Sequence, residues 1–419
     1  MEARIPAPPN VLSPEHVVDP WPGLAVLREH YPVHYDADAE FWMLSRYSDI
    51  RPISRGSGPG PAFQELLGQY LGDAVSFPSL DGAEHRHRRR LLAPFFARSG
   101  VESFQYRIER QARGLLEPIV ERERAAVAAG LRTRGEMDFI EEFTSRFPLH
   151  VMIDMLDLPE VDYSRMHAWF RAWTGAEGNV SRNPELFERA LWAREDFGEF
   201  VLPIIAERRS SNADDLISKM CTAELDGMSL PDEEVRSIAA GMILGGGETT
   251  DHQLGWLMHE LAGHPKQQQA LAEDRALMDK ALAESMRHSS IVQYIGRTPS
   301  EDLEIHGTTI PAGSSVALLI ASANHDPDRW QNPDEFDMFR TDHDASKAFI
   351  GSAEHLGFGA GPHFCIGSHL SKMEMEVAMN LVLDNIGDIR LADGFEAQPE
   401  PDAPFIRALP SLKITFELQ

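Results

Sequence analysis

The spacing of apolar residues along the chain predicts a protein built mainly from helices. Apolar positions recur at helical spacing in five separate stretches, at residues 101–129, 139–158, 163–175, 183–206 and 213–224. A longer helix is predicted from residue 229 to residue 262, because a serine cap, an early proline and a run of acids mark its start and Gly263-His264-Pro265 its end. At about 1.5 Å per residue it would measure about 45 Å, enough to cross the whole molecule.

Strand-like patterns are few. The aromatic run at residues 41–45 predicts a short strand that leads into the start of a helix. Residues 55–61, Arg-Gly-Ser-Gly-Pro-Gly-Pro, break regular structure, and from there to Ser79 we expect a long loop with one short helix at 63–70. Long loops in compact domains are often binding loops. Phe77 is therefore a candidate wall of a pocket, although a plain core phenylalanine fits the pattern as well.

Composition narrows the classes of partner. The chain has 419 residues, 42% of them hydrophobic, so it can bury a large core, and its length alone would suggest two or three domains. A formal net charge of −27 disfavours nucleic acid or an anionic membrane as partner. The polar, proline-rich N-terminus offers neither a signal peptide nor a membrane anchor. The two cysteines, Cys221 and Cys365, are far apart, as expected in a reducing cytoplasm, and Cys221 is expected to be a structural thiol.

A run of three glycines interrupts the long helix. The stretch is Gly245-Gly246-Gly247-Glu248-Thr249-Thr250. Glycine in a helix costs about 1 kcal/mol relative to alanine, so we expect something flat, such as a cofactor and a diatomic ligand, to need the space. The acid and hydroxyl that follow could relay protons into an apolar pocket. The alternative is that Thr249 and Thr250 only bond back to carbonyls within the helix.

A second motif surrounds Cys365. The loop Phe358-Gly359-Ala360-Gly361-Pro362-His363-Phe364-Cys365-Ile366-Gly367 precedes a run of good helix formers. A helix N-terminus favours the thiolate, which is a soft metal ligand. A single cysteine excludes a structural zinc site or a four-cysteine iron–sulfur cluster. An axial ligand to haem iron or a nucleophile remains, and a buried free cysteine beside a glycine-rich turn is the plain alternative.

Both motifs resemble those of the cytochrome P450 family. Residues 358–367 fit Phe-Gly-x-Gly-x-His-x-Cys-x-Gly, the pattern of the family's haem-binding loop, at every fixed position. Residues 245–250 resemble its Ala/Gly-Gly-x-Asp/Glu-Thr-Thr signature. The resemblance extends over essentially the whole chain. It implies a mainly α fold with a minor β region, a triangular prism-like single catalytic domain over residues 21–419, after an extended N-terminal segment over residues 1–20.

The resemblance also implies a cofactor, haem b, with Cys365 as the axial ligand of the iron. Phe358 and Gly359 would lie beside the haem in the same loop. His85 and Arg89 are four residues apart on a predicted helix and share a face, so they can meet one anion together. The residues that the resemblance assigns to the haem propionates are His85, Arg89, Arg297 and His363.

Other matches concern the scaffold and the pocket. Glu284 and Arg287 match the family's Glu-x-x-Arg, and Arg340 matches the third member of that network, which would fold and hold the haem loop. Gly247 stands where many relatives carry a larger residue, which predicts a roomier pocket. Ile291 stands where relatives usually have proline, so the strand beside the haem could run differently. The candidate pocket residues are Phe77, Gly245, Val292, Phe405 and Ile406.

By the same resemblance the chain is expected to be a cytoplasmic monooxygenase that inserts oxygen from O2 into an apolar small molecule. Glu248 and Thr249 would be the acid–alcohol pair that supplies protons. Because no flavin or nicotinamide fingerprint is present, the electrons of NAD(P)H would arrive through a ferredoxin and its reductase. The basic run at residues 86–90 is either the ferredoxin docking patch or a solvated face.

Two other functions remain open. A haem-thiolate peroxygenase would usually lack the acid–alcohol pair. A non-catalytic haem sensor or electron carrier would need neither that pair nor a mobile lid, which the resemblance places at the polar stretch 174–183.

Overall fold

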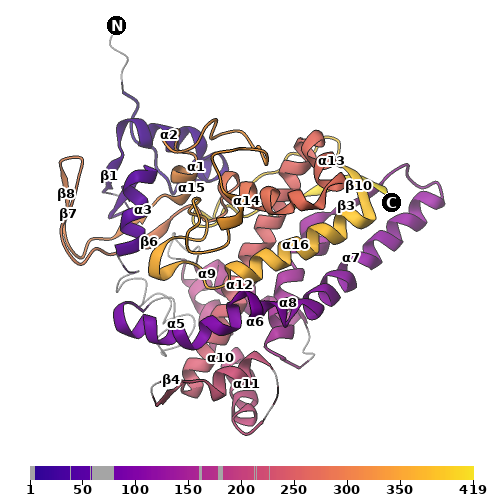
Figure 1. The fold of residues 1–419 in the computed structure, drawn as a ribbon, viewed down its shortest axis with the longest axis horizontal. Helices are drawn as coiled ribbons and strands as arrows, with labels where there is room; N and C mark the ends of the chain where they lie inside the picture. The colour runs from indigo at the N-terminus through magenta and orange to yellow at the C-terminus, as the bar shows by residue number, and fades with distance from the viewer. Residues whose placement is uncertain are drawn as a thin grey trace.

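The computed structural model describes residues 5–37, 39–56, 58, 80–159, 163–177, 183–211, 213, 215–225 and 227–419. Helices dominate this part of the chain (Figure 1). The α-helices are α1 (Pro14–Val18), α2 (Trp21–His30), α3 (Tyr47–Gly56), α5 (Gly82–Phe96), α6 (Arg98–Glu102), α7 (Gln105–Ala128), α8 (Phe147–Met155), α9 (Tyr163–Glu177), α10 (Pro184–Arg208), α11 (Leu216–Thr222), α12 (Asp232–Gly263), α13 (Pro265–Glu273), α14 (Met278–His288), α15 (Ile320–Asn324) and α16 (Ser368–Asn385). A π-helical turn, η2 (Ile140–Thr144), and three 3₁₀ turns, η3 (Arg275–Leu277), η4 (Ala345–Lys347) and η5 (Gly361–His363), complete the helical elements of the described residues.

The β structure is minor, as the sequence predicts. A four-stranded sheet has the order β1-β2-β9-β6 and lies at one corner of the molecule (Figure 1). In it β2 pairs in parallel with β9, Trp42 opposite Val316, and the other two pairings are antiparallel. A three-stranded sheet has the order β10-β11-β3, and β4-β5 and β7-β8 are hairpins. The strands are β1 (Val33–Asp36), β2 (Phe41–Leu44), β3 (Gly135–Asp138), β4 (Glu224–Leu225), β5 (Met228–Ser229), β6 (Ile295–Arg297), β7 (Leu303–Ile305), β8 (Thr308–Ile310), β9 (Val316–Leu318), β10 (Ile386–Leu391) and β11 (Lys413–Leu418).

The long helix α12 is the centre of the core. It has 32 residues and crosses the middle of the molecule, with α16 in front of it in Figure 1. Most of its residues are buried, polar ones included, as expected of a helix surrounded by other elements. The predicted serine cap is wrong, because Ser229 pairs with Glu224 in the β4-β5 hairpin and Pro231 occupies the N-cap position. The acids of the first turn, residues 232–234, are present as predicted.

Several other boundaries differ from the sequence prediction. The stretch 139–158 is not one helix, because η2 ends at Thr144 and Pro148 lies in the first turn of a new helix, α8. The segment predicted as extended over residues 1–20 contains α1, whose N-cap Ser13 accepts a hydrogen bond from the His16 amide. The predicted loop at 59–79, with its short helix and Phe77, lies outside the described residues.

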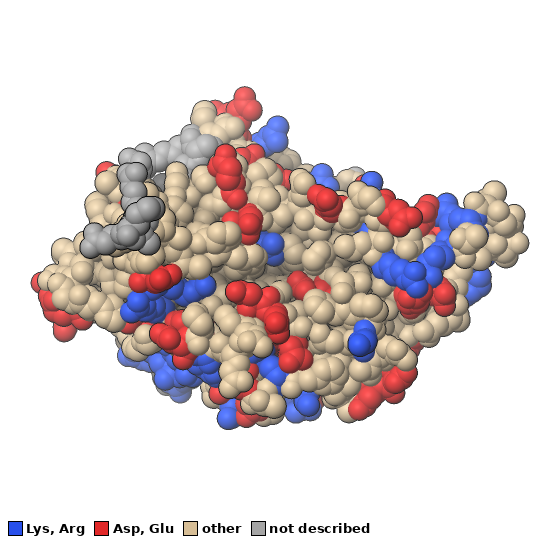
Figure 2. Space-filling view, turned by 90° about the horizontal axis from the view of Figure 1, so that it is seen from above, with Lys and Arg blue, Asp and Glu red and all other residues tan. Residues whose placement is uncertain are grey.

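The surface carries both signs of charge. Acidic and basic side chains are interspersed over the face seen in Figure 2, and basic ones gather along its lower left edge. Among the described residues, none of the helices is both long and apolar enough to cross a lipid bilayer.

Candidate functional site

A cavity of about 450 Å³ lies between α12 and α16. Its walls come from α5, α12, α14, β6, α16, the loop at 357–367 and the C-terminal segment at 405–406. Most of the lining is apolar, and the polar groups are concentrated in four places. These are the cysteine loop, a cluster of arginine and histidine side chains, the middle of α12, and Ser371 and Glu374 on α16.

The cysteine loop is shaped by two glycines. Gly359 and Gly361 have φ of 69° and 72°, a region that side chains disfavour. A Cβ on Gly361 would also lie 2.6 Å from the Cα of Arg55, so the loop packs directly on α3. The Cys365 amide donates to the Phe358 carbonyl at 2.9 Å, which closes the turn, and α16 begins three residues later. As a result the Cys365 side chain opens into the cavity.

The protonation of Cys365 differs from the sequence expectation. Burial raises the pKa of this thiol, and the Gly367 amide and the Arg89 guanidinium only partly offset it. The Gly367 amide therefore favours the thiolate, as predicted for a helix N-terminus, but burial outweighs it in the protein by itself. A bound metal cation would supply the missing stabilisation, since a coordinating thiol loses its proton.

One end of the cavity gathers four basic side chains. The rings of His85 and His363 are stacked with their centroids 4.0 Å apart, and Arg89 Nη2 donates to the Phe364 carbonyl at 2.7 Å. Arg297 is 7% exposed, its Nε has no hydrogen-bond partner among the described residues, and burial lowers its pKa to about 10. The nearby acid is Asp81, whose Oδ1 is 3.3 Å from His363 Nε2. A buried guanidinium with an unused donor needs an anion, so this end fits a ligand that carries carboxylates.

The three central glycines of α12 serve different purposes. A Cβ on Gly245 would meet nothing within 4 Å, so this residue leaves open space in the cavity. A Cβ on Gly246 would lie 2.6 Å from Met152 Sδ, and one on Gly247 would lie 3.0 Å from Phe170 Cε2. These two glycines therefore admit α8 and α9 close to α12. The prediction that Gly247 enlarges the pocket is wrong, because this position faces α9.

Glu248 and Thr249 both line the cavity, as the motif predicts. The Thr249 hydroxyl donates to the Gly245 carbonyl at 2.8 Å, which is the back-bonded arrangement that the sequence left open. Its oxygen can still accept a hydrogen bond from the cavity side. Thr250 also lines the cavity, but its hydroxyl donates to Ser371 Oγ of α16 at 3.2 Å. The two threonines therefore have different hydrogen-bond partners, Thr249 within α12 and Thr250 on α16.

A buried acid of the cavity was missed by the sequence reasoning. Glu374 of α16 lines the cavity, and its Oε1 has no hydrogen-bond partner among the described residues. Burial raises its pKa well above the ordinary value, although the Thr250 hydroxyl opposes the shift. The only signal in the sequence was its position four residues after Leu370, on the same helix face. Gln253 Oε1, also on the lining, is another buried oxygen without a partner in the described part of the chain.

The far wall of the cavity joins two distant segments. Val292 and Ile406 form an antiparallel bridge, and the Gln293 amide donates to the Phe405 carbonyl at 2.9 Å. The Ile291 carbonyl accepts from the Arg407 amide at 2.7 Å, so isoleucine at this position is compatible with the pairing. Val292, Phe405 and Ile406 all line the cavity with Gly245, and the structure brings these candidate pocket residues together.

The predicted charge network forms outside the cavity. Glu284 and Arg287 make a bidentate pair, with Oε1–Nη2 at 2.7 Å and Oε2–Nε at 3.0 Å, and Arg340 Nε lies 2.8 Å from Glu284 Oε2. Glu284 and Arg287 are fully buried. Arg287 also donates to three backbone carbonyls, those of Asn324, Pro333 and Glu335. The network therefore fastens the segment that leads into the cysteine loop.

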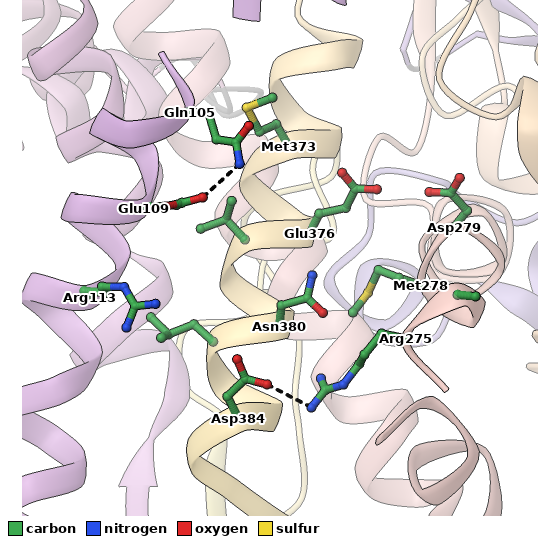
Figure 3. A pocket seen from close by; sticks show the side chains of 13 residues that line it. Gln105, Glu109, Arg113, Arg275, Met278, Asp279, Met373, Glu376, Asn380 and Asp384 are labelled. Carbon is green, nitrogen blue, oxygen red and sulfur yellow. Dashed lines mark hydrogen bonds and ion pairs between the residues drawn. The ribbon is translucent and has the colours of Figure 1, made fainter. Parts of the chain in front are cut away.

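A second hollow lies on the opposite face of α16, between α7, η3 and α14 (Figure 3). It measures about 530 Å³. Its polar side chains largely have partners already. Gln105 donates to Glu109 at 2.9 Å and Arg275 to Asp384 at 3.2 Å, while Asp279 and Glu376 both pair with Lys372. The described residues contain no group of three or more histidine, cysteine or acidic side chains arranged to hold a metal ion. The central cavity is therefore the candidate site.

Comparison with known proteins identifies the family. The sequence matches the family model for cytochrome P450 over residues 51–386. It is 32% identical over 389 residues to pulcherriminic acid synthase of Bacillus subtilis (strain 168), covering 92% of this chain and 93% of that protein. It is 29% identical over 424 residues to cytochrome P450 monooxygenase PikC of Streptomyces venezuelae, covering 97% and 93%. The fold superposes on the ligand-free structure of cytochrome P450 TbtJ1 with a TM-score of 0.81 and 27% identity, covering 96% of this chain and 99% of that one.

These matches confirm the resemblance and the single-domain fold that the sequence predicts. Members of this family use haem and O2. With a cavity that presents one cysteine sulfur, four basic side chains and an acid–alcohol pair, the chain belongs to the cytochrome P450 family and is a haem-dependent monooxygenase.

Proposed function

We propose that the chain hydroxylates, or otherwise oxidises, an apolar small molecule with electrons delivered by a ferredoxin. The observation that carries the proposal is the cavity itself, in which the Cys365 sulfur and the Glu248–Thr249 pair border the same space. Cys365 would hold the haem iron through its sulfur. Bound in this way, the haem supplies O2 activation, since a thiolate ligand favours cleavage of the O–O bond.

The basic end of the cavity would hold the haem propionates. Arg89 and Arg297 offer guanidinium donors, and His85 and His363 stand beside them. Arg297 supports this role most directly, because its buried Nε has no partner in the described part of the chain. Phe358 and Gly359 line the cavity from the cysteine loop. The buried charge network of Glu284, Arg287 and Arg340 would keep that loop folded.

Glu248 and Thr249 would manage protons at the oxygen side. The Thr249 hydroxyl, fixed by its bond to the Gly245 carbonyl, would present its oxygen as an acceptor to the cavity. Glu248 would hold the proton that is passed inward. The apolar residues around them, such as Leu244 and Ile291, would exclude bulk water and so prevent loss of electrons to side products.

The substrate would lie against Gly245, where a side chain would have open space, and against Val292, Phe405 and Ile406. These groups are apolar, so they favour an apolar molecule. The ferredoxin would dock at the basic run on α5. Arg86 and Arg90 are exposed there, whereas Arg88 is engaged with Glu234 at 2.6 Å. A reducing cytoplasm suits the two free cysteines.

The test is reconstitution of the haem-bound protein with a ferredoxin, its reductase and NAD(P)H. A library of small apolar compounds is first screened for those that shift the haem from low to high spin. With such a compound we expect NAD(P)H consumption that depends on the compound and forms an oxygenated product. Product formation with hydrogen peroxide alone, and none with the ferredoxin, would favour the peroxygenase. Haem reduction without product from any compound would favour an electron carrier or sensor.

The axial ligand has a separate test. We expect Cys365→Ala and Cys365→His to abolish the absorption band of the reduced, carbon-monoxide-bound form from which the family takes its name, because the thiolate produces that band. The matched control is Cys221→Ala, since Cys221 is buried outside the cavity and should leave the band unchanged. Persistence of the band in the Cys365 variants would refute the assignment.

A further inference from the structure

A buried imidazole lies directly behind Glu248. His252 is one turn further along α12 and is 9% exposed. Its Nε2 is 3.9 Å from Glu248 Oε1, and its Nδ1 is 3.9 Å from Asp251 Oδ2. Within the described residues, these two carboxylates are the charged groups that act on the ring. His252 therefore lies between Glu248, which lines the cavity, and Asp251, which faces away from the cavity.

Asp251 is held in place by the π-helical turn η2. Thr144, the fully buried last residue of η2, donates from its hydroxyl to Asp251 Oδ1 at 2.6 Å. The π-helical turn packs tightly on α12, since a Cβ on Gly255 would come within 3.0 Å of Ile140 Cδ1. Here the turn fixes one oxygen of Asp251 and leaves the other toward the His252 ring.

The electrostatics suit a group that carries a proton near neutral pH. Burial lowers the pKa of His252, but Asp251 and Glu248 outweigh it, so the pKa is raised above its ordinary value. Burial raises the pKa of Asp251 to about 6, with a further contribution from Glu248, while His252 and the Thr144 hydroxyl oppose the shift. The group that η2 contributes here, the Thr144 hydroxyl, is neutral. Both charged acids, Glu248 and Asp251, belong to α12 itself.

A purely structural ion pair would look different. Such a pair is expected to close to hydrogen-bond distance, about 2.7–2.9 Å between charged nitrogen and oxygen atoms. Both separations here are 3.9 Å, and His252 Nδ1 has no hydrogen-bond partner among the described residues. A small rotation or one bridging water would connect the ring to either acid. The ring is therefore placed to exchange a proton with Glu248.

We infer that His252 is the positioning residue that restores the proton of Glu248 after each delivery into the cavity. The inference rests on the proposed role of Glu248. In the step, the Nε2–H bond of the imidazolium breaks and an O–H bond forms on Glu248 Oε1. The ring remains neutral with its proton on Nδ1, facing Asp251, and takes up one proton from water to become cationic again. Asp251 stabilises that cation, and Thr144 holds Asp251 in place.

The first test does not depend on turnover. Imidazole resonances of isotopically labelled protein are titrated by NMR in the diamagnetic reduced, carbon-monoxide-bound form, and His252 is assigned by its absence from His252→Gln. We expect its pKa to lie above the ordinary value and to fall in both Glu248→Gln and Asp251→Asn. A pKa at or below the ordinary value, or one that neither substitution moves, would overturn the inference. Only the assignment uses this variant, so if His252→Gln folds poorly the resonance is assigned instead by through-bond correlation in the native protein.

The second test measures coupling. We expect His252→Gln to lower the product formed per NAD(P)H by about three- to tenfold, less than the loss of a direct general acid. The deficit should shrink as the pH rises through the pKa of His252, because the native ring then no longer carries the proton that it passes on. The control is His306→Gln, since His306 is on the surface hairpin β7-β8, 2.9 Å from Asp49, and should not affect coupling.

Two further variants separate this inference from the proposed function. If Glu248→Gln and Thr249→Ala uncouple the enzyme while His252→Gln matches the native protein at every pH, the inference alone is wrong. If Glu248→Gln and Thr249→Ala also leave coupling intact, the proposed relay fails and the role of His252 fails with it.

Discussion

At the scale of single residues, burial changes what a side chain can do. Thr249 illustrates this, because its hydroxyl hydrogen is bound to the Gly245 carbonyl while the side chain still borders the cavity. The hydroxyl can then act on the cavity only as an acceptor, which is what a relay needs in order to hold a donor such as water. The back-bonded arrangement and the catalytic role are therefore compatible.

We expect Thr249→Ala to bind haem normally but to divert electrons to peroxide or water, because the acceptor that orders the proton donor is lost. Product per NAD(P)H should fall about tenfold or more, within the range of general acid–base effects. Thr249→Ser, which keeps the hydroxyl, is the control and should retain most of the yield. An unchanged yield in the alanine variant would contradict the relay.

Glu374 makes a pH-dependent prediction. Because burial raises its pKa in the folded state, its contribution to stability is fully present below the unfolded-state pKa and is lost as the pH rises through the folded-state pKa. Glutamine is neutral at every pH, so we expect Glu374→Gln to be more stable than the native protein at pH 8 and to lose that advantage at pH 5. An unpaired buried polar group costs about 1–3 kcal/mol, which sets the scale of the gain.

The measurement is denaturant unfolding of the haem-bound protein at both pH values. Asp384→Asn, at the exposed end of the same helix, is the control and should show no such pH dependence. If Glu374→Gln differed from the native protein equally at pH 5 and pH 8, Glu374 would not be the titrating group.

At this scale the sequence predicted residues that belong to local motifs. Cys365, Glu248 and Thr249 follow from fixed spacings, and the structure places them around one cavity. Glu374 and His252 were missed, because their significance comes from partners on other elements and from exclusion of water, neither of which spacing reveals. The effect of burial on the pKa of Cys365 was missed for the same reason, since it outweighs the contribution of the Gly367 amide at the helix terminus.

At the scale of elements, the charge network of α14 shows that ion pairs about one helical turn apart can differ widely in their contribution to stability. Glu284 and Arg287 are fully buried and are joined by Arg340, whereas Arg98 and Glu102, one turn apart on α6, are exposed. Removing one partner of a buried pair leaves uncompensated charge, which typically costs about 3–5 kcal/mol. An exposed pair contributes about 0–1 kcal/mol.

We therefore expect Glu284→Gln to lower the free energy of unfolding by about 3–5 kcal/mol and to reduce the haem bound per chain, because Arg287 and Arg340 lose their shared carboxylate. Glu102→Gln is the control and should change stability by less than about 1 kcal/mol. The measurements are the haem bound per chain and the free energy of unfolding by denaturant, made on both variants. Equal effects in the two variants would show that the network does not secure the loop.

The boundaries of elements were less predictable than their existence. The centre and length of α12 followed from the pattern of apolar positions, but its start did not, because Ser229 is used by the β4-β5 hairpin. The stretch 139–158 was predicted as one helix because its apolar residues continue across the break between η2 and α8. Pro148, in the first turn of α8, was the available signal.

At the scale of the whole molecule, the protein is acidic, but α5 carries a run of basic residues at 86–90. With a formal net charge of −27, long-range attraction of an acidic partner must come from local charge. Arg86 and Arg90 are exposed, while Arg88 and Arg89 are directed to Glu234 and to the cysteine loop. In the basic run, Arg86 and Arg90 are thus available to a partner protein, whereas Arg88 and Arg89 bind groups of this chain.

We expect the double substitution Arg86→Glu and Arg90→Glu to raise the KM for an acidic ferredoxin about tenfold at low salt, since opposite charge accelerates encounter. The effect on KM should become smaller as the ionic strength rises, because the screening length becomes shorter. Arg390→Glu with Lys413→Glu, two exposed cations on the β10-β11 sheet at the other side of the molecule (Figure 1), is the control. Equal effects of both pairs would rule out a localised docking patch.

The parallel pairing of β2 with β9 has a consequence for biosynthesis. Trp42 lies opposite Val316, which follows it by 274 residues in the sequence. The early strand β2 therefore cannot pair with β9 until those residues have been made. At about 5–20 residues per second, translation of that interval takes roughly 14–55 s. During this time the edge of β2 that faces β9 has no native partner. The corner of the molecule beside the cysteine loop can therefore close only after three quarters of the chain have been made.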